Sequence, residues 1–178
     1  TNTDAEKQIR LTFADAYGGV QQRLKIGNET IKVRIPPGAK QGTKIRLRGK
    51  GNLDPYTRQR GDLYLKVQLI PHSFYQFDGD NLICEVPISP EEAVLGASIE
   101  VPTPSGKVTM TIPPGIRSGQ TLRLRGKGWP NPKEEPSDQL VKIIIATPKK
   151  ISAQERKLYE KISASRSYDP RAEMKYEL

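Results

Sequence analysis

The sequence predicts a mainly β protein made of two tandem, similar β-sandwich domains, each with one short helix, followed by a C-terminal helix. Three observations lead to this fold class. A segment of the chain recurs, apolar and polar residues alternate over short stretches, and turn residues are abundant, with 15 Gly and 15 Pro among 178 residues. Short strands joined by tight turns have these properties.

The recurring segment indicates that one module occurs twice. The longest pair of matching segments has 11 identities in 17 positions, at an offset of 77 residues. Three pairs match in the same order: 12–19 with 89–96, 35–51 with 112–128, and 62–69 with 138–145. We therefore expect a first domain at 6–83, a second domain at 84–150 and a C-terminal segment at 151–178.

Each module is predicted to contain a short helix and a hairpin. Ser89, Pro90 and Glu92 provide the cap, the first-turn proline and the capping-box acid of a helix start, and Thr12 occupies the position equivalent to Ser89. Period-2 alternation then predicts two antiparallel strands around Gly27-Asn28, and two more around 104–106. The last strands are expected at 62–70 and 138–146.

A C-terminal helix is predicted after Ser152. Ser152 and Glu155 form a capping box, and Leu158 and Ile162 give the helix a narrow apolar stripe because they are four residues apart. The residues alone leave two possibilities open. The stripe packs on its own domain, or it contacts a second copy of the chain.

Composition excludes several classes of protein. No apolar run exceeds a few residues, whereas a membrane span needs roughly 20, so we expect no membrane segment. The single cysteine, Cys84, and the single histidine, His72, cannot supply the four ligands of a structural zinc site. No disulfide can form within the chain, which favours a reducing compartment. We expect no metal and no cofactor.

The residues also argue against an enzyme. Cys84 lies in an alternating strand pattern and is expected to be a packed thiol, since no second histidine could activate it. His72 follows Pro71 and is expected in a turn. The acidic pairs Glu91-Glu92 and Glu134-Glu135 are adjacent in sequence, so they would not face each other across a substrate.

Several motifs together resemble one family. They are the duplicated Ile-Pro-Pro-Gly…Arg-Leu-Arg-Gly-Lys-Gly segment, the strand entry Gly61-Asp62-Leu63, and the segment 77–82 between the copies. These motifs are similar to the C-terminal peptide-binding region of J-domain co-chaperones, the DnaJ or Hsp40 family. The resemblance covers roughly residues 6–164. It implies two β-sandwiches, a client-binding groove on the first, and a C-terminal dimerisation segment that would include Leu158 and Ile162.

The resemblance also implies partners and a location. It implies a chaperone of the cytoplasm that acts in protein folding and the stress response, binds unfolded client polypeptides and delivers them to an Hsp70. No His-Pro-Asp motif is present, so the J-domain that stimulates the Hsp70 ATPase lies outside these residues. Short connections replace the Cys-x-x-Cys zinc module of some members, so the chain resembles the zinc-free subclass.

The resemblance places the client groove between the opening strand and the first hairpin strand. It implies Ile9 and Leu11 on the former, Leu24 and Ile26 on the latter, and Leu65 from the last strand as client-binding residues. Lys25 is implied as a contact for an acidic tail of Hsp70. An alternating apolar residue is more often part of a core, and the sequence leaves open which face each side chain takes.

The charge of the chain favours a second interpretation. Net charge is +9, and basic residues cluster in both modules. Such clusters bind nucleic-acid phosphates without sequence preference, as in the curved-DNA-binding relatives of the family. Aromatic residues for base stacking are scarce, at 6% of the chain, so nucleic acid ranks second as a partner. The clusters contain Lys44, Arg46, Arg48, Lys50, Arg58, Arg60, Arg123, Arg125 and Lys127.

Overall fold

A computed structural model describes residues 3–178 of the chain. Contacts divide the chain into two compact units, one ending at Ile145 and one comprising Ala146–Leu178. The first unit holds both β modules, and the second holds the C-terminal helix.

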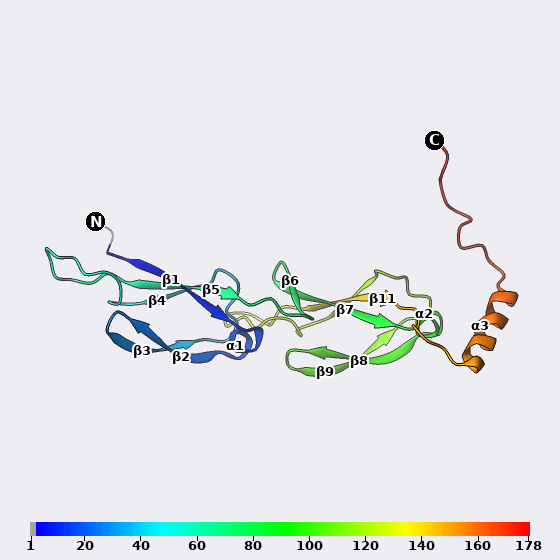
Figure 1. Ribbon diagram of the computed structural model, residues 1–178, viewed down its shortest axis with the longest axis horizontal. Coiled ribbons are helices and arrows are strands. Elements are labelled where there is room, and N and C mark those ends of the chain that lie inside the picture. The colour runs from blue at the N-terminus through cyan, green and yellow to red at the C-terminus, as the bar shows by residue number, and fades with distance from the viewer. Residues whose placement is uncertain (1–2) are drawn as a thin grey trace. The chain divides into compact units, whose positions relative to one another are not determined.

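The first module is a small sandwich of two sheets. The first sheet has the order β1-β5-β4, with β1 parallel and β4 antiparallel to β5, and the second is the antiparallel hairpin β2-β3. Figure 1 shows this hairpin lying beneath the first sheet. The elements are β1 (Ala5–Leu11), α1 (Phe13–Gly18), β2 (Val20–Ile26), β3 (Glu29–Ile35), β4 (Lys44–Leu47) and β5 (Leu63–Leu69).

The second module repeats this arrangement and adds one strand. Its larger sheet has the order β10-β11-β7-β6, and its hairpin is β8-β9. The predicted pair of similar sandwiches is therefore confirmed. Strand β7 begins at Asn81, because residues 81–83 already pair with β6 and β11, so the second module starts before residue 84. The elements are β6 (Gln76–Asp78), β7 (Asn81–Ile88), α2 (Pro90–Leu95), β8 (Ala97–Thr103), β9 (Gly106–Ile112), β10 (Thr121–Leu124) and β11 (Gln139–Ile145).

Local sequence signals determine where these elements begin and turn. The Thr12 side chain accepts a hydrogen bond from the Asp15 N–H at 3.1 Å, and Ser89 and Glu92 form the predicted capping box. Gly27, at a positive φ of 58°, makes the two-residue turn that joins β2 to β3. A turn of this kind matches the twist of the strands and fixes their register.

Each module has its own core, and side chains of the second module complete the first core. Leu11, Ile35 and Leu65 lie in the first core, and Val101, Val141 and Ile143 lie in the second. Trp129 and Leu82 come from the second module, yet they belong to the first core and are 1% and 0% exposed. Large side chains of the second module, Trp129 foremost among them, therefore tie it to the first.

The second unit contains one helix, α3 (Ala153–Ser165). Ser152 and Glu155 form its predicted capping box. No residue of α3 is buried, and the stripe residues Leu158 and Ile162 are 52% and 64% exposed. Among the residues that the structure describes, no helix is long and apolar enough to cross a membrane.

Candidate functional site

Strand β2 has an open edge in the first module. Within residues 3–178, β2 pairs with β3 alone, so one of its two edges has no neighbouring strand. The turn at Gly27-Asn28 makes Ile26 and Glu29 the closing hydrogen-bonded pair. Hydrogen-bonded pairs alternate along an antiparallel ladder, so the main-chain groups of Gln21, Arg23 and Lys25 point away from β3. These three residues form the free edge.

A hydrogen bond from β1 agrees with this direction of the β2 main-chain groups, away from β3. Lys7 on β1 donates a hydrogen bond from Nζ to the carbonyl oxygen of Lys25, at 3.4 Å. That carbonyl therefore faces β1 and not β3. Since β1 is itself the outer strand of the first sheet, the open edges of β1 and β2 lie on the same side of the module. Lys7 was not among the predicted site residues.

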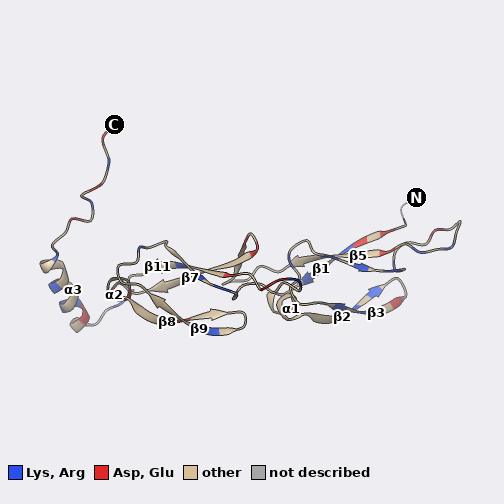
Figure 2. Cartoon of the chain, turned by 180° about the vertical axis from the view of Figure 1, so that it is seen from behind, with Lys and Arg blue, Asp and Glu red and all other residues tan. Residues whose placement is uncertain are grey.

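The predicted groove residues fall into two groups by burial. Ile9, Leu11 and Leu65 are only 6%, 1% and 0% exposed and belong to the first core. Leu24 and Ile26 are half-buried and pack against the edge of that core. The side chains that a bound segment could reach are therefore those of β2. Lys25 is exposed, as are the other basic positions of β2 and β3, Arg23, Lys32 and Arg34. Figure 2 shows blue segments on this hairpin.

The equivalent edge of the second module is blocked. Pro102 replaces Lys25 at this position of β8 and has no N–H to donate. Its carbonyl oxygen already accepts a hydrogen bond from Nε2 of buried Gln139, at 2.9 Å. The residues equivalent to Leu24 and Ile26, Val101 and Thr103, are 0% and 6% exposed. Of the two equivalent strands β2 and β8, only β2 thus combines free main-chain groups along its open edge with half-buried apolar side chains beside it.

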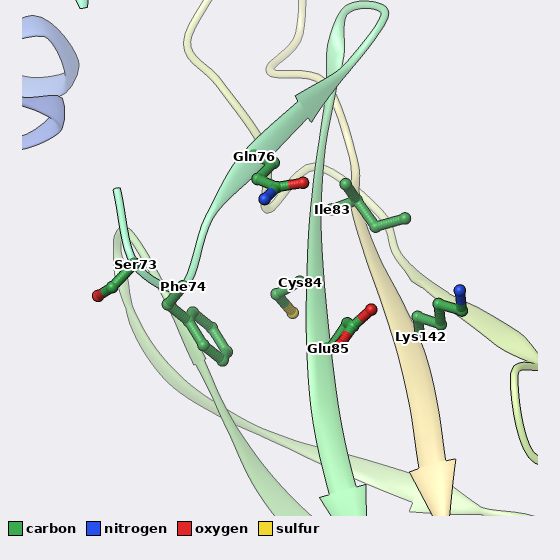
Figure 3. Close-up of a pocket in the computed structure, with 7 residues that line it drawn as sticks. All are labelled: Ser73, Phe74, Gln76, Ile83, Cys84, Glu85 and Lys142. Carbon is green, nitrogen blue, oxygen red and sulfur yellow. The ribbon is translucent and has the colours of Figure 1, made fainter. Parts of the chain in front are cut away.

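A hollow of about 500 Å³ lies along β7 of the second module. Figure 3 shows Cys84 and Phe74 close together on one side of β7, with Glu85 on the same strand and Lys142 on β11. Burial raises the pKa of the Cys84 thiol, although a hydrogen bond from Gln139 opposes this. A thiol with a raised pKa is a poor nucleophile at neutral pH, so Cys84 is a packing residue.

Acidic side chains neutralise much of the predicted basic surface. Glu29, at the end of the β2–β3 hairpin, binds Arg60 at 3.0 Å and Lys50 at 3.3 Å, and these hydrogen bonds lower the pKa of Glu29. Arg46 binds Asp62 at 2.6 Å, and Arg123 binds Asp138 at 2.5 Å. Lys44 lies 3.7 Å from Glu6. The remaining members of the basic clusters are Arg48, Arg58, Arg125 and Lys127.

The remaining residues considered as catalytic candidates, His72 and the acidic pair Glu91-Glu92, have structural roles. Nδ1 of His72 accepts hydrogen bonds from the backbone N–H groups of Phe74 and Tyr75, so His72 holds a turn, as predicted. Glu92 serves in the cap of α2, and Glu91 lies in the same first turn. Among residues 3–178, no group of three or more His, Cys, Asp or Glu side chains could hold a metal ion.

Comparison with known proteins gives the same family as the motifs. Residues 5–148 match the DnaJ C terminal domain. The chain belongs to the DnaJ family. It is 59% identical over 168 residues to a DnAJ-like protein of Synechocystis sp., covering 94% of this chain and 50% of that protein.

Further relatives of this DnaJ-family chain have two kinds of name. The chaperone protein DnaJ 2 of Synechocystis sp. is 38% identical over 169 residues, covering 94% of this chain and 53% of that protein. A curved DNA-binding protein of Coxiella burnetii is 39% identical over 185 residues, covering 96% of this chain and 58% of that protein. The chain thus spans about half the length of these relatives.

Proposed function

We propose that this DnaJ-family chain binds extended segments of unfolded client proteins along the free edge of β2. The observation that carries the proposal is the open edge formed by Gln21, Arg23 and Lys25, beside the half-buried side chains of Leu24 and Ile26. An extended peptide adds a strand to such an edge and places alternate side chains into neighbouring apolar positions. Main-chain hydrogen bonds tolerate many client sequences.

The available apolar contacts allow only weak binding at a single groove. Burying one Leu- or Phe-sized client side chain contributes roughly 1.5–3 kcal/mol. Micromolar affinity requires about 8 kcal/mol after the costs of association. Leu24 and Ile26 alone therefore do not hold a client tightly, and the proposal requires several main-chain bonds or more than one groove. Weak, reversible binding suits a protein that passes its clients to another chaperone.

A proline substitution tests the free edge directly. The N–H of Arg23 points away from β3, so Arg23→Pro removes a donor that the client needs without removing a hydrogen bond of the β2–β3 ladder. We expect Arg23→Pro to weaken binding of an unfolded, apolar-rich client by about tenfold, which corresponds to one lost hydrogen bond of the stronger kind. The measurement is a fluorescence-anisotropy titration with a labelled client.

Two variants serve as controls for this experiment. Arg23→Ala removes the charge and keeps the N–H, so it should bind the client nearly normally. Lys32→Pro makes the same change at the cross-strand partner of Arg23, whose N–H faces the opposite edge of the hairpin. Equal losses for Arg23→Pro and Lys32→Pro would show that the client does not pair with β2.

We further propose that the chain acts with an Hsp70 and forms a homodimer in the cytoplasm. The resemblance to DnaJ chaperones supports the Hsp70 partner, and Lys25 is the proposed contact for its acidic tail. The exposed stripe of Leu158 and Ile162 supports the dimer, since a helix with no buried residue leaves this stripe uncovered. The proposed action is binding and delivery, with no covalent chemistry.

Nucleic-acid binding is a second candidate function. A curved DNA-binding protein is among the similar proteins, and Arg48, Arg58, Arg125 and Lys127 take part in none of the ion pairs described above. The salt dependence of binding separates the two functions. Phosphate contacts make the logarithm of affinity fall steeply with the logarithm of salt concentration, whereas strand addition with apolar contacts is little affected. A steep slope with DNA and no client binding would favour the second candidate.

A further inference from the structure

An aromatic pocket lies where the two modules meet. Its volume is about 230 Å³, and both modules contribute to its walls. Helix α1, the connection from β5 to β6, the β8–β9 turn and the loop after β10 each supply part of the lining. We call it the junction pocket, and its main lining residues are Phe13, Tyr17, His72, Tyr75, Pro104 and Trp129.

The aromatic walls of the junction pocket hold one another in place. The Trp129 ring lies 5.5 Å from that of Phe13 and 5.6 Å from that of Tyr17, and both contacts are edge-on. The His72 ring lies 5.3 Å from that of Phe13 and 5.0 Å from that of Tyr75. Phe13, Tyr17 and Tyr75 are only partly buried, so some of their ring surface is left for a ligand. Walls that are already fixed need little ordering when a ligand enters.

Three polar groups accompany these rings. Nδ1 of His72 accepts hydrogen bonds from the backbone N–H groups of Phe74 and Tyr75, at 2.9 and 3.1 Å, so the ring proton is on Nε2, which can donate to a ligand. Tyr17 and Tyr75 add hydroxyl groups, which both donate and accept. Burial raises the pKa of the Tyr75 phenol, so this hydroxyl keeps its proton at neutral pH. A ligand oxygen that both accepts and donates matches this set of groups.

The lining favours an uncharged ligand. Among the described residues that line the junction pocket, none carries a carboxylate, an ammonium or a guanidinium group. Aromatic rings attract cations, but a cation would lose its hydration here without a carboxylate to pair with, in a chain of net charge +9. An anion would also lose its hydration without an opposite charge beside it. The lining therefore selects against both kinds of ion.

The volume of the junction pocket limits the ligand to one ring. An apolar cavity of roughly 150 Å³ holds one benzene molecule, so about 230 Å³ accommodates a single ring with one or two small substituents. We propose that the junction pocket binds a small, uncharged phenol, which is one aromatic ring with a hydroxyl group. Because both modules form the walls, the bound phenol stabilises their junction. This site goes beyond client binding along β2, which it does not require.

A titration with p-cresol tests the junction pocket, because p-cresol is a neutral phenol with one small substituent. Trp129 is the only tryptophan and lines the pocket, so its fluorescence reports binding. We expect a saturable change with one molecule bound per chain, and a thermal midpoint that rises with the p-cresol concentration. Toluene, which lacks the hydroxyl group, should bind roughly three- to tenfold more weakly, the effect of one lost hydrogen bond. Benzylamine, which is a cation at neutral pH, should also bind more weakly than p-cresol.

Two pocket variants and one control locate the bound p-cresol. Tyr75→Phe removes a hydroxyl group and keeps the ring, so the dissociation constant should rise roughly three- to tenfold. His72→Asn keeps a side-chain acceptor for the turn and removes the donor Nε2, and it should raise the dissociation constant at least as much. Tyr56→Phe, at a position that is 92% exposed and outside the pocket, is the matched control and should leave binding unchanged.

Several results would overturn the proposal. They are the absence of any saturable change with p-cresol, and a loss of affinity in Tyr56→Phe as large as that in Tyr75→Phe. Toluene or benzylamine binding as tightly as p-cresol would show that the ligand is not a neutral phenol. N-acetyltyrosine amide carries the same ring on a peptide backbone and should bind more weakly than p-cresol. If it bound more tightly, the occupant would be a tyrosine side chain of a polypeptide, and the small-molecule ligand would be wrong.

Discussion

Asp62 and Asp138 occupy equivalent positions immediately before the last strand of each module. Oδ1 of each accepts a hydrogen bond from a glycine N–H, at 2.9 Å from Gly49 and 2.8 Å from Gly126, and Oδ2 of each binds an arginine. The backbone hydrogen bond is the largest cause that lowers the pKa of each carboxyl group, and the arginine is the second. The repeat thus conserves within one chain a small network that holds the Gly-Lys-Gly loop against its strand.

We predict that Asp62→Asn lowers the thermal midpoint at pH 7 and that this difference becomes smaller as the pH falls below about 4. A carboxyl group with a lowered pKa in the folded state contributes stability above its unfolded pKa of about 3.9, and this contribution is lost as the pH falls through the folded pKa. The difference between the two proteins should therefore shrink below about pH 4. Melting curves at several pH values measure it.

Two further variants serve as a repeat and a control for this measurement. Asp138→Asn should reproduce the effect in the second module, whereas Asp78→Asn, at an exposed position of β6, should change the midpoint little at any pH. If the midpoint of Asp62→Asn stayed below that of the native chain by the same amount from pH 7 to pH 3, the loss of stability would come from disturbed packing around the amide and not from the lost carboxylate charge.

At the scale of elements, the sequence predicted the helix starts and hairpin turns, because these depend on residues close together in the chain. The helix starts at Thr12, Ser89 and Ser152 follow from side chains that cap nearby N–H groups, and the hairpin turn at Gly27-Asn28 follows from the needs of a two-residue turn. The last strands were predicted within a residue or so of β5 and β11. The short strand β6 was not predicted, because three residues carry too little of a period-2 pattern.

The sequence could not show which side of a strand faces the core. Alternation places Ile9 and Leu11 on one face of β1, but their burial depends on pairing with β5, where Ile9 lies opposite Val67. The same pattern leaves Leu24 and Ile26 half-buried, because β2 lies at an edge. Likewise, the hydrogen bond from Trp129 to Ala39 joins residues 90 positions apart, and no local pattern predicts it.

We predict that Trp129→Ala destabilises the first module. Trp129 is buried among Phe13, Tyr17 and Phe77, and removing a buried aromatic side chain costs about 3–5 kcal/mol. Trp129→Phe should cost clearly less, since a ring remains and only the hydrogen bond to Ala39 and some contacts are lost. Urea unfolding followed by circular dichroism measures both variants.

The native protein offers a second measurement of the same contact. Trp129 is the only tryptophan, so its fluorescence reports on the junction of the two modules. If fluorescence and circular dichroism change at the same urea concentration, the modules unfold together, as the shared side chain requires. An earlier fluorescence transition, with a Trp129→Ala variant as stable as the native chain, would show that the junction contributes nothing to stability.

At the scale of the whole molecule, charge and valency decide how the protein meets its partners. The net charge is +9, and several lysines and arginines have carboxylate partners, so the long-range field is weaker than the count of lysines and arginines suggests. Binding of a mainly uncharged client should therefore depend little on salt. For the proposed client binding, affinity should depend more on how many β2 edges one assembly presents, since a single edge offers few apolar contacts.

We predict that the proposed dimer binds clients with two apolar segments more tightly than clients with one. Once the first segment is bound, the second groove meets its segment at an effective concentration of roughly millimolar, so a linker that spans both grooves raises affinity by about tenfold or more. The changes Leu158→Ser and Ile162→Ser should abolish this gain without unfolding the chain, because both side chains are already exposed. Affinity for a one-segment peptide should stay the same, since β2 is unchanged.

Titrations of matched one-segment and two-segment peptides, with sedimentation on the same samples, separate the number of binding sites from the chemistry of each site. A gain that persists in a monomeric variant would place both binding sites on one chain.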